Sequence, residues 1–205
     1  MEYVRSATQE DVVMARSNAA SLAAILCLAA ALPVQAQQQF GERLLMNAPA
    51  GWSAIPIQRG EKMVISRLFP PGESDKQWTQ AITVQMYPNS EQSARAFVEG
   101  IVAYSRDNCE AAGLGPVNEG MINNYPTAAV TITCTKGRTS GLGSFALVQA
   151  IRGREALYVV QRQWRGAPFG RDQNPGFPNE MLKEWAEFSR TIGLCDTRNS
   201  KHPCP

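Results

Sequence analysis

Arginine and aromatic side chains concentrate in the last third of this sequence. Residues 136–171 contain seven Lys or Arg residues and a single acid, Glu155. Arg and aromatic residues are enriched where proteins bind partners, and the planar guanidinium group matches carboxylate and phosphate. We therefore expect this region to bind an anionic ligand or an envelope protein. The candidate binding residues are Trp78, Arg162, Trp164, Arg165 and Arg171.

A purely structural explanation of the same residues stays open. Charged side chains on a strand face or sheet edge discourage association between sheets, and the Gly- and Pro-rich stretch 165–178 suits an ordinary connector. Trp78 and Trp164 flank predicted strand ends, where a pocket role and a packing role are both possible. Trp185 falls on the apolar stripe of a predicted helix and is expected in the core.

Residues suited to catalysis are scarce. His202 is the only histidine, and nucleophilic catalysis needs a base beside the nucleophile. Residues 141–144 lack the Gly-x-Ser-x-Gly order of a nucleophile turn, and no acid lies in a strongly apolar strand, where a raised pKa would be expected. The sequence favours a non-catalytic binding or accessory protein without a cofactor. The alternative is an envelope enzyme, such as a hydrolase that works through paired carboxylates.

The N-terminal segment has the features of an export signal. Arg16 precedes the apolar run 21–32, and small residues precede a predicted cleavage after Ala36. An uncut membrane anchor is the alternative, and translation starting at Met14 would give a more typical signal. The predicted organisation is a signal peptide (1–36), a single α+β domain (37–194) and a disulfide-closed C-terminal tail (195–205).

Four cysteines remain after the predicted cleavage. An even number in an exported chain indicates two disulfides. Of the three possible pairings we favour Cys109–Cys134 and Cys195–Cys204, because the partners lie beside each other in the predicted architecture. With one histidine and no closely spaced cysteine pair, the spacing does not fit a zinc site.

Charge and compartment limit the partners. Two of the 20 basic residues and three of the 18 acidic residues lie in residues 1–36, so the remaining chain has a net charge of +3. That value does not indicate nucleic-acid binding. We expect a periplasmic or secreted protein with no stable membrane anchor after cleavage.

Three alternating strands joined by short connections form the expected centre of the fold. They cover residues 127–134, 144–152 and 155–164. One helix, capped by Asn89 or Ser90, is predicted to start at residue 91 and a second at residue 179. We predict an α+β fold, a layered sandwich in which two helices pack on an antiparallel sheet of five to seven strands. The remaining predicted elements are strands at 63–69, 80–87 and 117–122 and helices ending near 108 and 192.

Pro49, Gly51 and Trp52, followed by Leu68-Phe69-Pro70 and the three-strand centre, give an order of elements that resembles the PsbP-like α/β/α sandwiches. The resemblance implies an accessory or binding module rather than an enzyme. The disulfides and the Arg-rich loop depart from that pattern. The chain is also similar to uncharacterised exported bacterial proteins.

Overall fold

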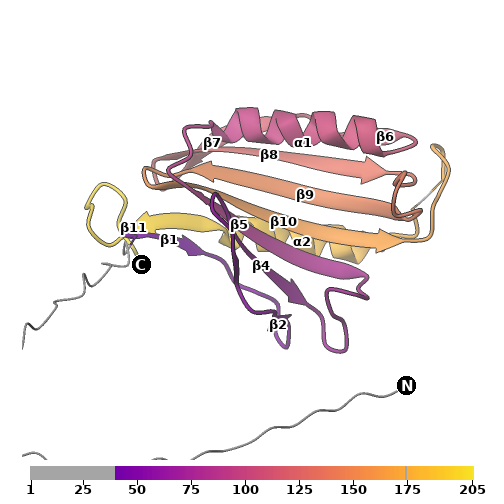
Figure 1. Cartoon of the computed structure of the whole chain (residues 1–205), viewed down its shortest axis with the longest axis horizontal. Coiled ribbons are helices and arrows are strands. Elements are labelled where there is room, and N and C mark those ends of the chain that lie inside the picture. Colours follow the sequence, from indigo (N-terminus) through magenta and orange to yellow (C-terminus); the bar gives the residue numbers. More distant parts are fainter. Residues whose placement is uncertain (1–39, 174) are drawn as a thin grey trace, which may run out of the picture. The chain divides into compact units, whose positions relative to one another are not determined.

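The computed structural model describes residues 40–173 and 175–205 (Figure 1). The predicted signal peptide and its cleavage site lie outside the described residues. The described helices are α1 (Ala94–Asn108) and α2 (Asn179–Thr191). The strands are β1 (Glu42–Leu45), β2 (Ser53–Ala54), β3 (Gln58–Arg59), β4 (Val64–Phe69), β5 (Gln80–Pro88), β6 (Ala112–Leu114), β7 (Asn118–Ile122), β8 (Tyr125–Cys134), β9 (Gly143–Arg152), β10 (Ala156–Gly166) and β11 (Gly193–Asp196).

The main sheet has nine antiparallel strands within the described residues. Its order is β2-β4-β5-β10-β9-β8-β6, with β3 paired to β4 and β7 to β8, while β1 and β11 form a separate pair. The α+β class with two helices is confirmed, but the expected five to seven strands are too few. Strands β2, β3 and β6 have only two or three residues. An alternating pattern cannot be recognised over so few residues.

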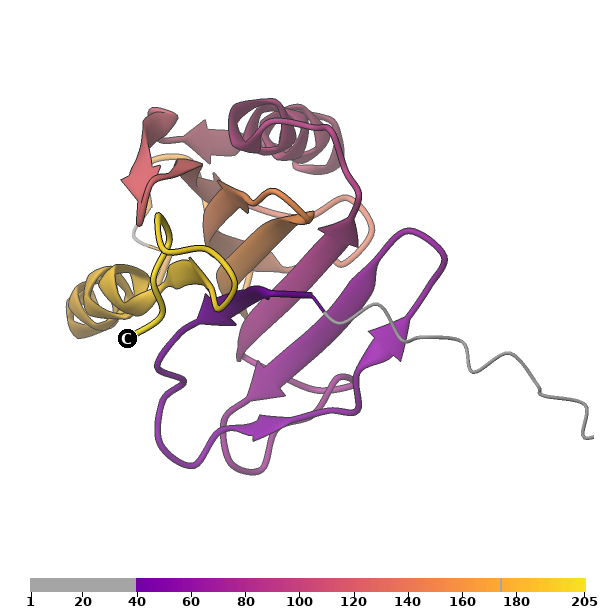
Figure 2. The ribbon, with the colours of Figure 1, turned by 90° about the vertical axis from the view of Figure 1, so that its left-hand side faces the viewer.

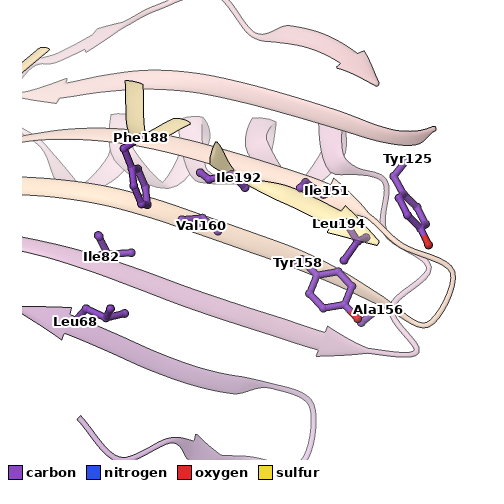
Figure 3. Packing of buried hydrophobic residues seen from close by; sticks show 10 residues of the cluster. All are labelled: Leu68, Ile82, Tyr125, Ile151, Ala156, Tyr158, Val160, Phe188, Ile192 and Leu194. Atoms are coloured by element: carbon purple, nitrogen blue, oxygen red, sulfur yellow. The ribbon is translucent and has the colours of Figure 1, made fainter. Parts of the chain in front are cut away.

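The two helices lie on opposite faces of the main sheet (Figures 1 and 2). Successive side chains of a strand point to opposite faces. On β10, Leu157 and Val159 pack with residues of α1, whereas Tyr158 and Val160 pack with residues of α2. Figure 3 shows the cluster on the α2 side, where Phe188 meets strand residues. Strand β10 is therefore buried on both faces at its start.

Helix α1 begins three residues later than predicted. Its N-cap is Ser93, whose side-chain oxygen accepts a hydrogen bond from the backbone N–H of Ala96 (3.1 Å). Such a side chain satisfies one of the free N–H groups of the first turn. The predicted caps Asn89 and Ser90 are wrong, since residues 91–93 lie between them and the first residue of the helix.

Helix α2 leads directly into β11, which pairs with β1. The predicted start of α2 at residue 179 is confirmed. The boundary drawn between residues 194 and 195 falls inside β11. Trp185 is 1% exposed, so its expected place in the core is confirmed.

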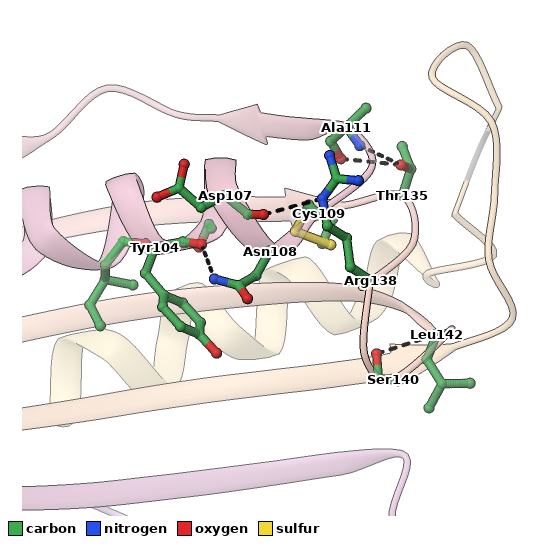
Figure 4. Close-up of a disulfide and its surroundings, with 12 residues drawn as sticks. Tyr104, Asp107, Asn108, Cys109, Ala111, Thr135, Arg138, Ser140 and Leu142 are labelled. Carbon is green, nitrogen blue, oxygen red and sulfur yellow. Dashed lines mark hydrogen bonds between the residues drawn. A yellow bond between two sulfur atoms is a disulfide. The ribbon is translucent and has the colours of Figure 1, made fainter.

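Both predicted disulfides are present. Cys109, at the end of α1, is bonded to Cys134 at the end of β8 (Figure 4), and Cys195 in β11 is bonded to Cys204. Disulfides persist in oxidising compartments, so this pair indicates an extracytoplasmic location. Among residues 40–173 and 175–205, no helix is long and apolar enough to cross a membrane.

Candidate functional site

The five predicted binding residues occupy three places in the fold. Arg162 and Trp164 lie on β10, on the face that α2 covers. The Arg165 guanidinium stacks on the Trp78 ring, 4.0 Å from its centroid, and Arg165 Nε donates to the Trp78 carbonyl oxygen (2.6 Å). Arg171 is exposed and lines a separate hollow at the β6–β8 edge. The structure thus brings together Arg165 and Trp78, but it does not gather all five residues in one site.

Trp164 belongs to an aromatic cluster that includes Phe177 of the Gly- and Pro-rich connector. Phe177, near the end of that connector, is buried and meets the Trp164 ring edge-on (5.7 Å between centroids). Phe177 also contacts Phe145 and Trp185 (4.9 and 5.3 Å). These contacts assign Trp164 a packing role on the α2 side of the sheet.

Arg162 is enclosed by three aromatic rings. Its side chain is only 3% exposed. Its guanidinium carbon lies 4.7 Å from the ring centroid of Trp52, 5.2 Å from that of Phe188 and 5.5 Å from that of Trp185. Burial lowers the pKa of Arg162, and the nearby charge of Glu184 acts in the opposite direction. Because an arginine does not lose its proton in a protein, the cage encloses a full positive charge.

That charge lacks a close anion. Arg162 Nε has no hydrogen-bond partner among the described residues. None of the ion pairs found within that part of the chain involves its guanidinium. A buried ion costs several kcal/mol of desolvation, and the three cation–π contacts of Arg162 offset part of this cost, at about 0.5–2 kcal/mol each. A bound anion would add charge-assisted hydrogen bonds to this guanidinium.

A pocket of about 450 Å³ opens onto Arg162. Its volume falls in the range of small-molecule sites, about 300–1,000 Å³. It lies between α2, the start of β5 and the turn before β2. Besides Arg162 and Pro49, its lining consists of two aromatic residues, two amides, two carboxylates and one hydroxyl: Trp52, Phe188, Asn47, Gln80, Glu184, Glu187 and Thr191.

A tight turn holds Trp52 over the guanidinium. The Trp52 N–H donates to the Pro49 carbonyl oxygen (3.2 Å), and Gly51 between them has φ +79°. Only glycine adopts this left-handed conformation without a steric cost. The Pro-x-Gly-Trp motif is thus the segment that forms one wall of the Arg162 pocket.

Arg162 is among the residues predicted from the sequence, whereas most of the residues around it in this pocket are not. Trp52 enters the sequence analysis only through the Pro-x-Gly-Trp motif, and the pocket residues of α2 and β5 have no distinguishing pattern. One signal was present: Arg162 follows Tyr158 and Val160 at the same alternating position of β10. A charged residue on the buried face of a central strand requires compensation, and this marks it as unusual.

A larger hollow, of about 560 Å³, lies beside α1 on the other face. Its floor carries amides that are already bonded to one another. Gln161 Nε2 donates to Gln85 Oε1 (2.8 Å), and the Thr83 hydroxyl donates to Gln163 Oε1 (2.8 Å). We therefore take the Arg162 pocket as the candidate site, since Arg162 Nε is buried and has no hydrogen-bond partner among the described residues.

No metal centre is evident in the described part of the chain, where no three His, Cys, Asp or Glu side chains gather as ligands.

Comparison with protein-family models finds no match, and comparison with curated proteins finds none either.

Proposed function

We propose that this chain is an exported, non-catalytic binding protein of the periplasm that takes a carboxylate ligand beside Arg162. The observation that carries the proposal is the buried guanidinium, which is enclosed by aromatic rings, unpaired at Nε and open to a pocket. Hydrogen bonds between a guanidinium and a carboxylate are charge-assisted and roughly twice as strong as neutral ones. The aromatic walls keep water away from that contact, which strengthens it.

Export is supported by two independent features. The sequence predicts a signal peptide over residues 1–36, and two disulfides agree with an oxidising compartment. We assign the periplasm in particular as part of the proposal. The resemblance to PsbP-like sandwiches, likewise proposed, is supported by the layering of α1, sheet and α2.

The direct test is a titration of the exported, oxidised protein with acetate, butyrate, benzoate and 3-phenylpropionate. Tryptophan fluorescence is a suitable readout because Trp52 forms a wall of the pocket. At least one of these carboxylates is expected to change the fluorescence saturably and to raise the melting temperature. Arg162→Met should abolish both effects, while the matched variant Arg165→Met should retain them. A native protein that responds to none of the four would refute the proposed function.

A hydrolase that uses paired carboxylates is the second candidate. It is favoured by one observation, namely that Glu184 and Glu187 line the same pocket. Both are exposed, whereas a carboxyl group acting as a general acid near neutral pH usually lies in an apolar environment. Turnover of an ester or glycoside that is lost in Glu184→Gln would favour this candidate over simple binding.

A further inference from the structure

We infer that the ligand is a zwitterion, in which a cationic amine accompanies the carboxylate; this rests on the proposed function of the Arg162 pocket. The inference starts from the distribution of charge. Among the described residues, the only cationic one lining the pocket is the buried Arg162, whereas two glutamates, Glu184 and Glu187, line it from α2 and are exposed to solvent. The pocket therefore has a positive floor and a negative rim.

The two rim carboxylates lie on the same side of α2. Residues three apart on a helix are neighbours on its surface, and Phe188, which follows Glu187, points inward against the Arg162 guanidinium. A ligand whose carboxylate reaches Arg162 must pass or remain near both glutamates. For a simple anion, these two like charges weaken binding; for a ligand with an ammonium group, they strengthen it.

The rim glutamates do not simply neutralise Arg162. Glu184 exerts an electrostatic effect on Arg162, yet none of the ion pairs found among the described residues joins the two. The cationic floor and the anionic rim are thus separate features, each available to a different group of the ligand.

The amide oxygen of Gln80 is a further hydrogen-bond acceptor in the pocket. Gln80 lines the pocket from the start of β5, and its buried Oε1 has no hydrogen-bond partner in the part of the chain that the structure describes. An amide oxygen only accepts hydrogen bonds, so it requires a donor such as an ammonium group. A carboxylate has no proton to offer at neutral pH. The N–H donors of Arg162 match the carboxylate of an amino acid, and the Gln80 oxygen matches its ammonium group.

The aromatic walls and the volume of the pocket indicate the side chain and the size of the ligand. Trp52 and Phe188 line the same pocket, and both rings lie against the Arg162 guanidinium. A pocket of about 450 Å³ holds a molecule of the size of an amino acid or a dipeptide. We therefore assign the ligand class as α-amino acids or similar amino-carboxylates with an apolar side chain.

The test compares three probes of one shape: 3-phenylpropionate, phenylalanine and 2-phenylethylamine. The exported, oxidised full chain is titrated with each, and calorimetry gives the dissociation constants. Phenylalanine is expected to bind about fivefold to tenfold more tightly than 3-phenylpropionate, because its ammonium group meets the rim carboxylates. The amine alone should bind more weakly than either, since it cannot engage Arg162.

The double variant Glu184→Gln/Glu187→Gln should remove the advantage of phenylalanine and leave 3-phenylpropionate bound as tightly as before or more tightly. Glu180→Gln, an exposed glutamate of α2 that does not line the pocket, is the matched control and should keep the advantage.

Two results would overturn the inference alone: equal or tighter binding of 3-phenylpropionate by the native protein, or an advantage of phenylalanine that survives in the double variant. If no carboxylate binds at all, the proposed function itself fails.

Discussion

At the scale of single residues, the buried charge of Arg162 is expected to lower the stability of the fold while it provides the binding group of the pocket. Replacing it with Met keeps the side-chain volume and removes a buried charge, and substitution of buried ions by apolar residues is often neutral or stabilising. We predict that Arg162→Met raises the free energy of unfolding by about 1–2 kcal/mol, measured by urea denaturation. A loss of more than about 2 kcal/mol would show that the cation–π contacts hold the core together.

A second residue-scale prediction concerns Glu42, which is 5% exposed. Its carboxylate accepts hydrogen bonds from the backbone N–H groups of Arg154 and Glu155, in the turn between β9 and β10. Hydrogen bonds to a charged group contribute about 1.5–3 kcal/mol. We expect Glu42→Gln to lower the free energy of unfolding by that amount. The exposed Glu61→Gln is the control; equal effects of both variants would contradict the assigned role of Glu42.

Arg162 can be singled out from the sequence, whereas the residues around it in the pocket cannot. Arg162 is identifiable because a charge occupies an inward position of a predicted strand. Its partners are not, since Trp52, Gln80 and Glu184 come from segments that are far apart in the chain and meet only after folding. Nothing in the local sequence of Gln80 distinguishes it from a solvent-exposed amide.

At the scale of elements, the two disulfides should contribute unequally. The Cys109–Cys134 bond closes a sequence separation of 25 and joins α1 to β8, whereas Cys195–Cys204 closes a separation of 9. The loop-entropy relation gives about 3.5 kcal/mol for the first and about 2.7 kcal/mol for the second. The double Ala variants, compared by urea denaturation, should show that order. The reverse order would indicate that the C-terminal loop anchors β11 by more than chain entropy.

Long elements were predictable and short ones were not. Strands β8, β9 and β10 each exceed nine residues, so their alternation is clear. Strand β11 starts one residue after α2 ends, and its four residues owe their conformation to pairing with β1, about 150 positions earlier in the chain. Such pairing depends on tertiary structure rather than on local propensity.

At the scale of the whole molecule, the fold class follows from patterning, whereas the function does not. Alternating strands and two apolar helix stripes suffice for an α+β sheet with a helix on each face. The ligand depends instead on which charges meet at one pocket, and a fold alone does not determine that. The Arg-rich composition of residues 136–171 includes Arg162, Arg165 and Arg171 alike, and it does not distinguish the buried Arg162 from the other two.

Alkaline pH should destabilise the whole fold through two buried tyrosines. Burial raises the pKa of Tyr125 and of Tyr158, and the charge of Glu42 raises both further. Above pH 10 the unfolded chain loses these protons while the folded chain keeps them. The contribution of these two tyrosines to the free energy of unfolding should therefore be constant below about pH 10 and should fall above it, by about 1.4 kcal/mol per pH unit for each tyrosine.

Urea denaturation between pH 9 and 11 tests this linkage. Tyr158→Phe should reduce the slope above pH 10 by about 1.4 kcal/mol per pH unit, because one of the two protons is no longer involved. The exposed Tyr104→Phe is the matched control and should leave the slope unchanged. If Tyr158→Phe leaves the slope as steep as in the native protein, Tyr158 ionises as readily in the folded chain as in water, and the buried position of its hydroxyl beside Glu42 is wrong.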